Sequence, residues 1–171
     1  MNIELSSDRL NFRKITYDDY GSICKILQDM DVMYAWEHAF SEEEVSKWIN
    51  KNLIRYENHG FSYFAVIEKG TNNFIGLMGP LVENIEGEEY IGIAYILAKQ
   101  YWGLGYGIEG AKACMDHAFN VLKADKVIAQ IRPENIQSQK VAQRLGMQVE
   151  REYLKVYDGK EVPHLIYSKT E

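Results

Sequence analysis

Three alternating glycines are the feature of this chain with the clearest chemical meaning. Gly103, Gly105 and Gly107 stand between an apolar run, residues 90–97, and a segment with helical periodicity, residues 108–122. Glycines at such a junction leave backbone N–H groups unobstructed at a helix N-terminus, where the positive end of the helix dipole also lies. The pattern predicts a binding site for an anion such as a phosphate.

The spacing of these glycines excludes the two commonest phosphate loops. A P-loop needs Gly-Lys-Ser/Thr at the helix start, but Ile108 follows Gly107 here. A dinucleotide fingerprint needs G-x-G-x-x-G, and Ile108 occupies the place of its third glycine. What remains is a Q-x-x-G-x-G pattern formed by Gln100, Gly103 and Gly105. A glycine-rich turn between a strand and a helix, without any ligand, is the alternative interpretation.

Composition narrows the class of protein. The chain has 171 residues, of which 46% are hydrophobic and 26% charged, and we expect one globular domain spanning 1–171. A net charge of -6 argues against a nucleic-acid partner, and it means that a polyanionic ligand must be held by local donors. We expect no membrane association, because no apolar run approaches the roughly 20 residues needed to span a bilayer. A cytoplasmic location is expected because the N-terminus does not resemble a signal peptide.

Histidines and cysteines predict no further chemistry. The four histidines show no metal-ligand spacing, so we expect no metal. Cys24 and Cys114 both lie in apolar segments with helical periodicity, which is typical of core thiols in a reducing compartment. Cys114 lies in the apolar run Ala113-Cys114-Met115 with no evident histidine pairing, so it does not look like a nucleophile.

Hydrophobic periodicity predicts the elements that must position the glycine loop. Strands are predicted at residues 9–15, 61–68, 74–81, 90–97, 127–132, 147–157 and 164–169. Helices are predicted after the capping boxes Thr16-x-x-Asp19 and Ser41-x-x-Glu44, and at 108–122 and 135–145. The order β α α β β β α β α β β predicts a mixed α/β domain with helices on both faces of one sheet.

A second motif, taken with this order of elements, resembles a known protein family. Asn135-x-x-Ser138 is followed by Leu145-Gly146-Met147, about thirty residues after the glycine loop. Together, the two motifs and the element order resemble the GNAT N-acetyltransferase superfamily over nearly the whole chain. They are similar to the branch of the ribosomal-protein N-terminal (alanine/serine) acetyltransferases. The resemblance implies a GNAT fold: a mostly antiparallel twisted sheet of about seven strands, flanked by about four helices and splayed between the fourth and fifth strands.

The resemblance also implies an activity and a cofactor site. It implies transfer of an acetyl group from acetyl-CoA (coenzyme A) to a primary amine, a protein N-terminus or a small molecule, by direct attack in a ternary complex. Leu97 would donate its N–H to the thioester oxygen, and Ser138 would protonate the departing sulfur. Asn135 either contacts the pantetheine arm or serves as a helix cap, and Ser138 is otherwise a surface hydroxyl. The residues implied to bind the cofactor are Tyr95, Ile96, Leu97, Gln100, Gly103, Leu104, Gly105, Tyr106, Gly107, Ile108, Asn135 and Ser138.

Two departures from the family pattern leave the acid–base groups open. Ala142 stands where many relatives have a tyrosine acid, and Gly92 stands where many have a glutamate base. Glu88 and Glu89 lie at the strand start, while Glu37 and His38 lie in an aromatic stretch between the first two helices. Glu37 or His38 is therefore the candidate base, and a surface or substrate-shaping position is the alternative.

The same aromatic stretch is the candidate acceptor pocket. The residues proposed to line it are Tyr34, Trp36, Phe40 and Trp102. Packing of the helix pair on the sheet is the alternative. The acceptor is expected to be a small-molecule or peptide amine, and relatives of this branch are often homodimers. The missing acid–base residues leave a non-catalytic acyl-CoA-sensing module as the rival function. A nucleotide-binding domain is disfavoured because no magnesium ligands accompany the glycines.

Overall fold

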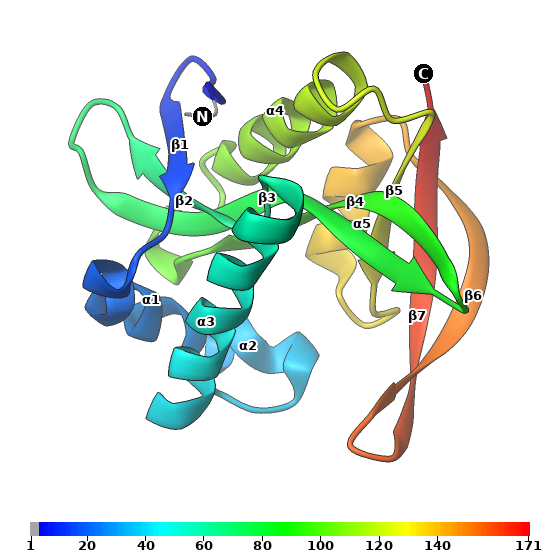
Figure 1. The fold of residues 1–171 in the computed structure, drawn as a ribbon, viewed down its shortest axis with the longest axis horizontal. Coiled ribbons are helices and arrows are strands. Elements are labelled where there is room, and N and C mark those ends of the chain that lie inside the picture. Colours follow the sequence, from blue (N-terminus) through cyan, green and yellow to red (C-terminus); the bar gives the residue numbers. More distant parts are fainter. Residues whose placement is uncertain (1–3) are drawn as a thin grey trace.

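The computed structural model describes residues 4–171 as one seven-stranded sheet with helices packed on it (Figure 1). The sheet order is β1-β2-β3-β4-β5-β7-β6, and its neighbours are antiparallel except for the parallel pair β4–β5. The strands are β1 Leu10–Lys14, β2 Phe64–Glu68, β3 Phe74–Ile85, β4 Glu88–Leu97, β5 Lys126–Ile131, β6 Gln148–Tyr157 and β7 Lys160–Thr170. The α-helices are α1 Tyr20–Leu27, α2 Met30–Met33, α3 Glu42–His59, α4 Tyr106–Asn120 and α5 Ile136–Arg144. The 3-10 helices are η1 Tyr17–Asp19, η2 Tyr34–Trp36 and η3 Lys99–Tyr101.

The predicted order of elements and the mostly antiparallel seven-stranded sheet are confirmed, with local differences. Both capping boxes form, at Thr16 and at Ser41, because each hydroxyl accepts an N–H bond while the acid three residues later bonds back. The aromatic stretch is not an open linker, because Asp29 caps the extra helix α2 and η2 follows it directly. That short helix raises the number of helices from the predicted four to five.

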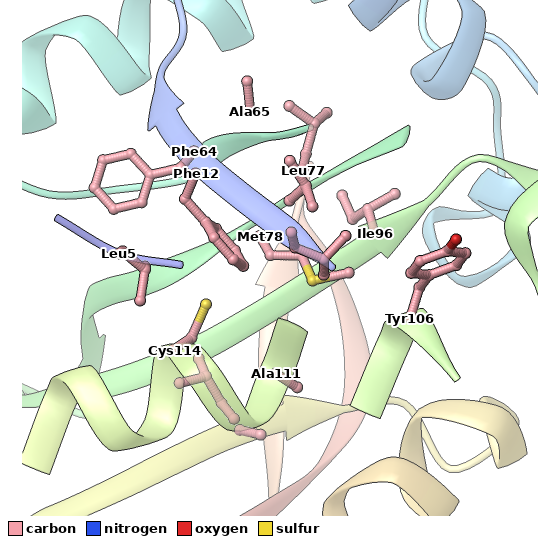
Figure 2. Packing of buried hydrophobic residues seen from close by; sticks show 14 of the residues in the cluster. Leu5, Phe12, Phe64, Ala65, Leu77, Met78, Ile96, Tyr106, Ala111 and Cys114 are labelled. Atoms are coloured by element: carbon pink, nitrogen blue, oxygen red, sulfur yellow. The ribbon is translucent and has the colours of Figure 1, made fainter. Parts of the chain in front are cut away.

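The core fills both sides of the sheet. Helices α1, α2 and α3 lie on one side, and α4 and α5 lie on the other (Figure 1). On the α4 side, the Cys114 side chain points toward Phe12 of β1 (Figure 2), and Ala111 and Met78 belong to the same buried cluster. Gly110 permits this close approach, since a Cβ at its position would lie 2.3 Å from the Met78 sulfur. Helix α4 is thereby pressed onto β3 and β4, so the loop before it is held at the end of β4.

The sheet parts between β4 and β5, as predicted. The two strands pair only at Ile91–Val127 and Gly92–Ile128, and no pairing is recorded between their later residues. Beyond Gly92, β4 continues with β3 while β5 follows β7. A wedge-shaped gap therefore opens from Gly92 toward the C-terminal end of β4, where the glycine loop begins. Within residues 4–171, no helix is long and apolar enough to cross a membrane.

Candidate functional site

The glycine loop adopts a backbone that requires two of its three glycines. Gly103 and Gly105 have φ of 75° and 84°, in the left-handed region that side chains disfavour. Gly107 has no such angle, and a Cβ there would make an ordinary 3.6 Å contact with Leu97. The conformational requirement therefore matches the Q-x-x-G-x-G pattern. Gln100, the first residue of that pattern, is exposed in η3.

Backbone donors are available along this loop. Among the described residues, no acceptor is recorded for the N–H groups of residues 103–108, and the first helical bond is from Glu109 N–H to Gly105 O at 3.2 Å. Leu104 is exposed, whereas Ile108 is half-buried. Six consecutive N–H groups at the start of a 15-residue helix form the arrangement that binds a phosphate.

The loop is tied to the first strand by charged side chains. The Arg9 guanidinium donates to Glu109 at 2.7 Å and to the Leu104 carbonyl at 3.1 Å, and it stacks on the Tyr106 ring at 4.1 Å. The Tyr106 hydroxyl donates to the Glu68 carboxylate, and the Tyr106 side chain is buried. These contacts hold the loop in one shape before any ligand arrives.

One edge of the gap is the backbone of β4. Ala98 N–H bonds Ile75 O on β3. Because backbone groups alternate along an antiparallel pair, Ile96 also faces β3, and Tyr95 and Leu97 turn their N–H and C=O groups to the gap. The indole N–H of Trp102 donates to the Leu97 carbonyl at 3.0 Å, which leaves the Leu97 N–H available. Of the three predicted β4 residues, Ile96 is thus the one whose N–H and C=O groups are both directed to β3.

The other edge is the start of α5. Asn135 caps this helix, with Oδ1 accepting from Ser138 N–H at 3.2 Å, and the same oxygen accepts from the Tyr34 hydroxyl at 2.7 Å. The Tyr95 hydroxyl crosses from β4 and donates to the Ser138 carbonyl at 2.8 Å. Burial raises the pKa of Tyr95 above its ordinary value, so this group stays protonated. The Ser138 hydroxyl has no partner recorded within residues 4–171 and is free to act.

The aromatic residues predicted as an acceptor pocket divide into two groups. Tyr34 reaches the α5 start, and Trp102 covers the end of β4 with 44% of its surface exposed. Trp36 and Phe40 instead pack against the hydrophobic core. The packing alternative holds for that second pair, because they fasten the segment between α2 and α3 to the sheet.

The geometry around Glu37 and His38 argues against either residue as a general base. Glu37 contacts Arg132 at 3.1 Å and Lys160 at 3.2 Å, and these hydrogen bonds lower its pKa. His38 bonds Glu44 at 2.8 Å, and this bond raises the pKa of the imidazole toward the charged form. A carboxylate held by two cations and an imidazolium held by a carboxylate are both weak proton acceptors.

Sequence reasoning missed a carboxylate that lies where the family's glutamate is absent. A Cβ at Gly92 would lie 2.8 Å from Glu83 Cγ, so the β3 side chain covers this β4 glycine. Leu81 is directly opposite Gly92, which places Glu83 and Gly92 on the same face of the sheet. Glu83 therefore sits at the apex of the gap. The sequence signal was the glycine itself, since a strand glycine often marks a close approach of another group.

The environment of Glu83 is polar and positively charged. Gln130 on β5 donates to its carboxylate at 3.0 Å, while Gln130 Oε1 is buried with no donor among the described residues. Burial raises the pKa of Glu83, and the nearby cations Lys155, Arg55 and Lys51 act in the opposite direction. The net result is a carboxylate with a pKa above its ordinary value.

Other titratable groups are less suited to chemistry. Cys114 is fully buried, and burial raises the pKa of its thiol, so it is no nucleophile. His164 is buried on β7, where its Nδ1 lies 3.1 Å from the Val162 carbonyl and burial lowers its pKa. Within residues 4–171, no cluster of three His, Cys, Asp or Glu side chains could hold a metal ion.

Comparison with known proteins shows which family this chain matches. The acetyltransferase (GNAT) domain family matches residues 9–148. YkkB of Bacillus subtilis (strain 168) is 32% identical over 145 residues, which cover 84% of each chain. An acetyltransferase of the GNAT family from Bacillus anthracis has a TM-score of 0.81 and 27% identity, covering 99% of this chain and 98% of that chain. The RimL ribosomal L7/L12 α-N-protein acetyltransferase, solved with coenzyme A, has a TM-score of 0.77 and covers 99% of this chain and 98% of that chain; at 18% identity it shows the fold.

Proposed function

This chain belongs to the GNAT acetyltransferase family and is an acyltransferase, and from that premise we propose that it transfers the acetyl group of acetyl-CoA to a primary amine in a ternary complex. The observation that carries the proposal is a row of backbone N–H groups that have no recorded hydrogen-bond acceptor. The N–H groups of residues 103–108 and of Leu97 lie on one path, from the glycine loop into the gap. A neighbour of the same fold was solved with coenzyme A, which supports this choice of ligand.

The residues present fit the chemical parts of such a cofactor. The loop donors would hold the pyrophosphate at the α4 N-terminus, where the helix dipole favours negative charge. The gap-facing backbone of Tyr95 would pair with an amide group of the pantetheine arm, as an added strand would. Asn135 has its side-chain oxygen in use, so only its Nδ2 donors are left for that arm.

Residues of the gap then supply the catalytic contacts. When bound, acetyl-CoA supplies an activated thioester. The Leu97 N–H would donate to the thioester oxygen as negative charge develops there, a contact whose removal typically costs about 10²–10³ in rate at comparable sites. The free Ser138 hydroxyl would give its proton to the sulfur. Buried Cys114 offers no alternative covalent route, which favours direct attack by the amine.

The test is amine-dependent release of thiol from acetyl-CoA, measured with peptides, amino acids, polyamines and aminoglycosides as acceptors. Gly105→Trp places a bulky side chain on a left-handed residue of the loop, and we expect it to abolish acetyl-CoA binding and release together. Ser138→Ala should lower kcat about 10- to 100-fold while leaving acetyl-CoA affinity within about twofold. Tight binding of acetyl-CoA without release for any amine would refute the transferase, and release unaffected by Gly105→Trp would refute this cofactor site.

A further inference from the structure

We propose that Glu83 is the base that receives the proton of the acceptor amine, and that the acceptor carries an anionic group close to that amine. The proposal rests on the function proposed above, and it assigns both a proton acceptor and a substrate class to the same site. It is carried by the position of Glu83 over Gly92, by its bond to Gln130, and by three unpaired cations around it.

The position of Glu83 places a carboxylate at the apex of the gap. It lies over Gly92, the last β4 residue that pairs with β5, and on the face of the sheet that carries α3. Leu97 and the glycine loop lie toward the open end and on the α4 side, since a Cβ at Gly107 would touch Leu97. A ligand that runs from the loop into the gap therefore approaches Glu83 from the opposite face. An amine bound at Glu83 would then lie on the α3 face of the sheet, with β4 between it and the glycine loop. It would enter the gap at the apex, beside Gly92.

The polar pair at this apex has the chemistry to hold an ammonium group. Gln130 Nε2 donates to Glu83 Oε2, which fixes the carboxylate against β5. The same amide leaves Oε1 buried with no donor among residues 4–171. A protonated amine offers three N–H donors, and the Glu83 carboxylate and Gln130 Oε1 can both accept from a donor. The Glu83 carboxylate and Gln130 Oε1 are thus two hydrogen-bond acceptors, one of them charged, and an ammonium group would donate to both.

The proton balance of the reaction uses this carboxylate once. Glu83 takes one proton from the ammonium, which frees the nitrogen lone pair. The N–C bond then forms as the C–S bond breaks, the nitrogen loses a second proton, and the sulfur gains one through Ser138. The products are an amide, the CoA thiol and one proton left on Glu83, which solvent removes. Burial raises the pKa of the Glu83 carboxyl above its ordinary value, which makes the carboxylate a better proton acceptor than an exposed one.

The charged groups that face Glu83 are mostly cations. Lys51 and Arg55 approach from α3, and Lys155 approaches from β6. Tyr63, before β2, and Tyr90, directly opposite on β4, are the neighbouring phenols. Burial raises the pKa of Glu83 more than these cations lower it.

The three cations leave positive charge that Glu83 alone does not balance. Among the described residues, none of Lys51, Arg55 and Lys155 forms an ion pair. Burial and the charges of Arg55 and Lys155 lower the pKa of Lys51, so the three repel one another. A carboxylate or phosphate on the acceptor would relieve this repulsion, whereas a polyamine would add to it. The site therefore fits an acid-bearing amine, such as an amino acid or the N-terminus of an acidic peptide.

The base is tested with Glu83→Gln, which keeps the shape of the side chain and removes its ionisation. We expect kcat/KM at pH 7 to fall about 100-fold or more. The limb of the wild-type pH profile in which the rate rises as Glu83 ionises should disappear, while acetyl-CoA affinity is unchanged. Glu89→Gln is the matched control, since this exposed β4 carboxylate should leave both the rate and the profile as in wild type. Glu83→Asp should retain the acidic limb at a lower rate, which separates loss of the base from a loss of folding.

The substrate class is tested with matched acceptors, namely amino acids against their amides and peptides with Asp against Asn at the second position. The acid-bearing member of each pair should have the higher kcat/KM. Lys155→Met should raise the KM of the acid-bearing acceptor about tenfold while leaving the KM of the matched amide unchanged. A Glu83→Gln enzyme with the wild-type rate and pH profile would overturn the base, and polyamines as the best acceptors would overturn the substrate class. A wild-type enzyme that acetylates no amine would instead overturn the proposed function and this inference with it.

Discussion

Glu109 illustrates at the scale of one residue how the cofactor loop is kept in place. Its carboxylate accepts from the Ser7 hydroxyl at 2.7 Å, from Arg9 N–H at 2.8 Å and from Arg9 Nε at 2.7 Å. Burial alone would raise its pKa, but these hydrogen bonds outweigh burial and lower it. The side chain thus joins the N-terminal segment to the first turn of α4.

Glu109→Gln should lower the free energy of unfolding by about 1–3 kcal/mol at pH 7, because the hydrogen bonds from Ser7 and Arg9 lose their charged acceptor. A lowered pKa in the folded state gives stability that is present above the unfolded value of about 4.3 and is lost as pH falls through the folded pKa. The deficit of the variant should therefore shrink as the pH is lowered from 7 to about 3. Urea unfolding at both pH values checks this, and an equal deficit at both would show that the ionised carboxylate is not the cause.

Single residues differ in how well the sequence predicted them. Gly103 and Gly105 were predicted because a left-handed backbone before a helix leaves a recognisable glycine pattern. Glu83 was not, because its position depends on the pairing of β3 with β4, which no local pattern encodes. Glu37 and His38 were proposed as bases because they are the titratable residues of the aromatic stretch and the usual glutamate is absent. Their ion-pair partners come from distant segments, as Arg132 and Lys160 do for Glu37.

At the scale of elements, Glu37 links three parts of the fold. It follows η2 with a positive φ of 66°, and its carboxylate bonds Arg132 at the end of β5 and Lys160 at the start of β7. Arg132 also donates to the Ala35 carbonyl at 2.5 Å. These bonds hold the segment between α2 and α3 beside the β6–β7 hairpin.

Glu37→Gln should loosen this segment without removing a proton acceptor. Amides of residues 34–40 should exchange faster with deuterium, because the neutral side chain binds the two cations more weakly. Acetyl-CoA affinity and the acidic limb of the pH profile should remain as in wild type. Loss of that limb in Glu37→Gln would instead make Glu37 the base and would contradict the assignment to Glu83.

The order of elements was predictable, and their ends were less so. The capping boxes at Thr16 and Ser41 fixed two helix starts, since their hydrogen bonds are local. The predicted strands 74–81 and 90–97 were too short: β3 continues to Ile85 and β4 begins at Glu88. The turn itself is Glu86-Gly87, both with positive φ, and cross-strand pairing extends the strands to its edges.

At the scale of the whole molecule, ligand binding should be visible as stability. A ligand that binds only the native state adds about 2.7 kcal/mol at a concentration 100 times its Kd. Acetyl-CoA should therefore raise the melting temperature, whereas ATP and NAD should not, because the loop lacks the fingerprint of either site. Gly105→Trp is the control and should abolish the shift. An equal shift with ATP would indicate a general phosphate site instead of an acetyl-CoA site.

The distribution of charge also belongs to this scale. The net charge of -6 predicts no preference for anions. The fold nevertheless gathers Lys51, Arg55 and Lys155 from two distant segments around one carboxylate. Composition could not predict this local reversal, because it arises only when α3 and β6 are brought to the same face of the sheet.

The most direct test of the account is to incubate the wild-type protein with acetyl-CoA and the mixed amine panel, and to compare the thiol released with the acetylated amine identified by mass spectrometry. The account predicts equal amounts of the two, formation of an amide on a primary amine, and preference for an acid-bearing acceptor. Thiol released without an acetylated amine, or acetyl-CoA bound with no product from any amine, would contradict it.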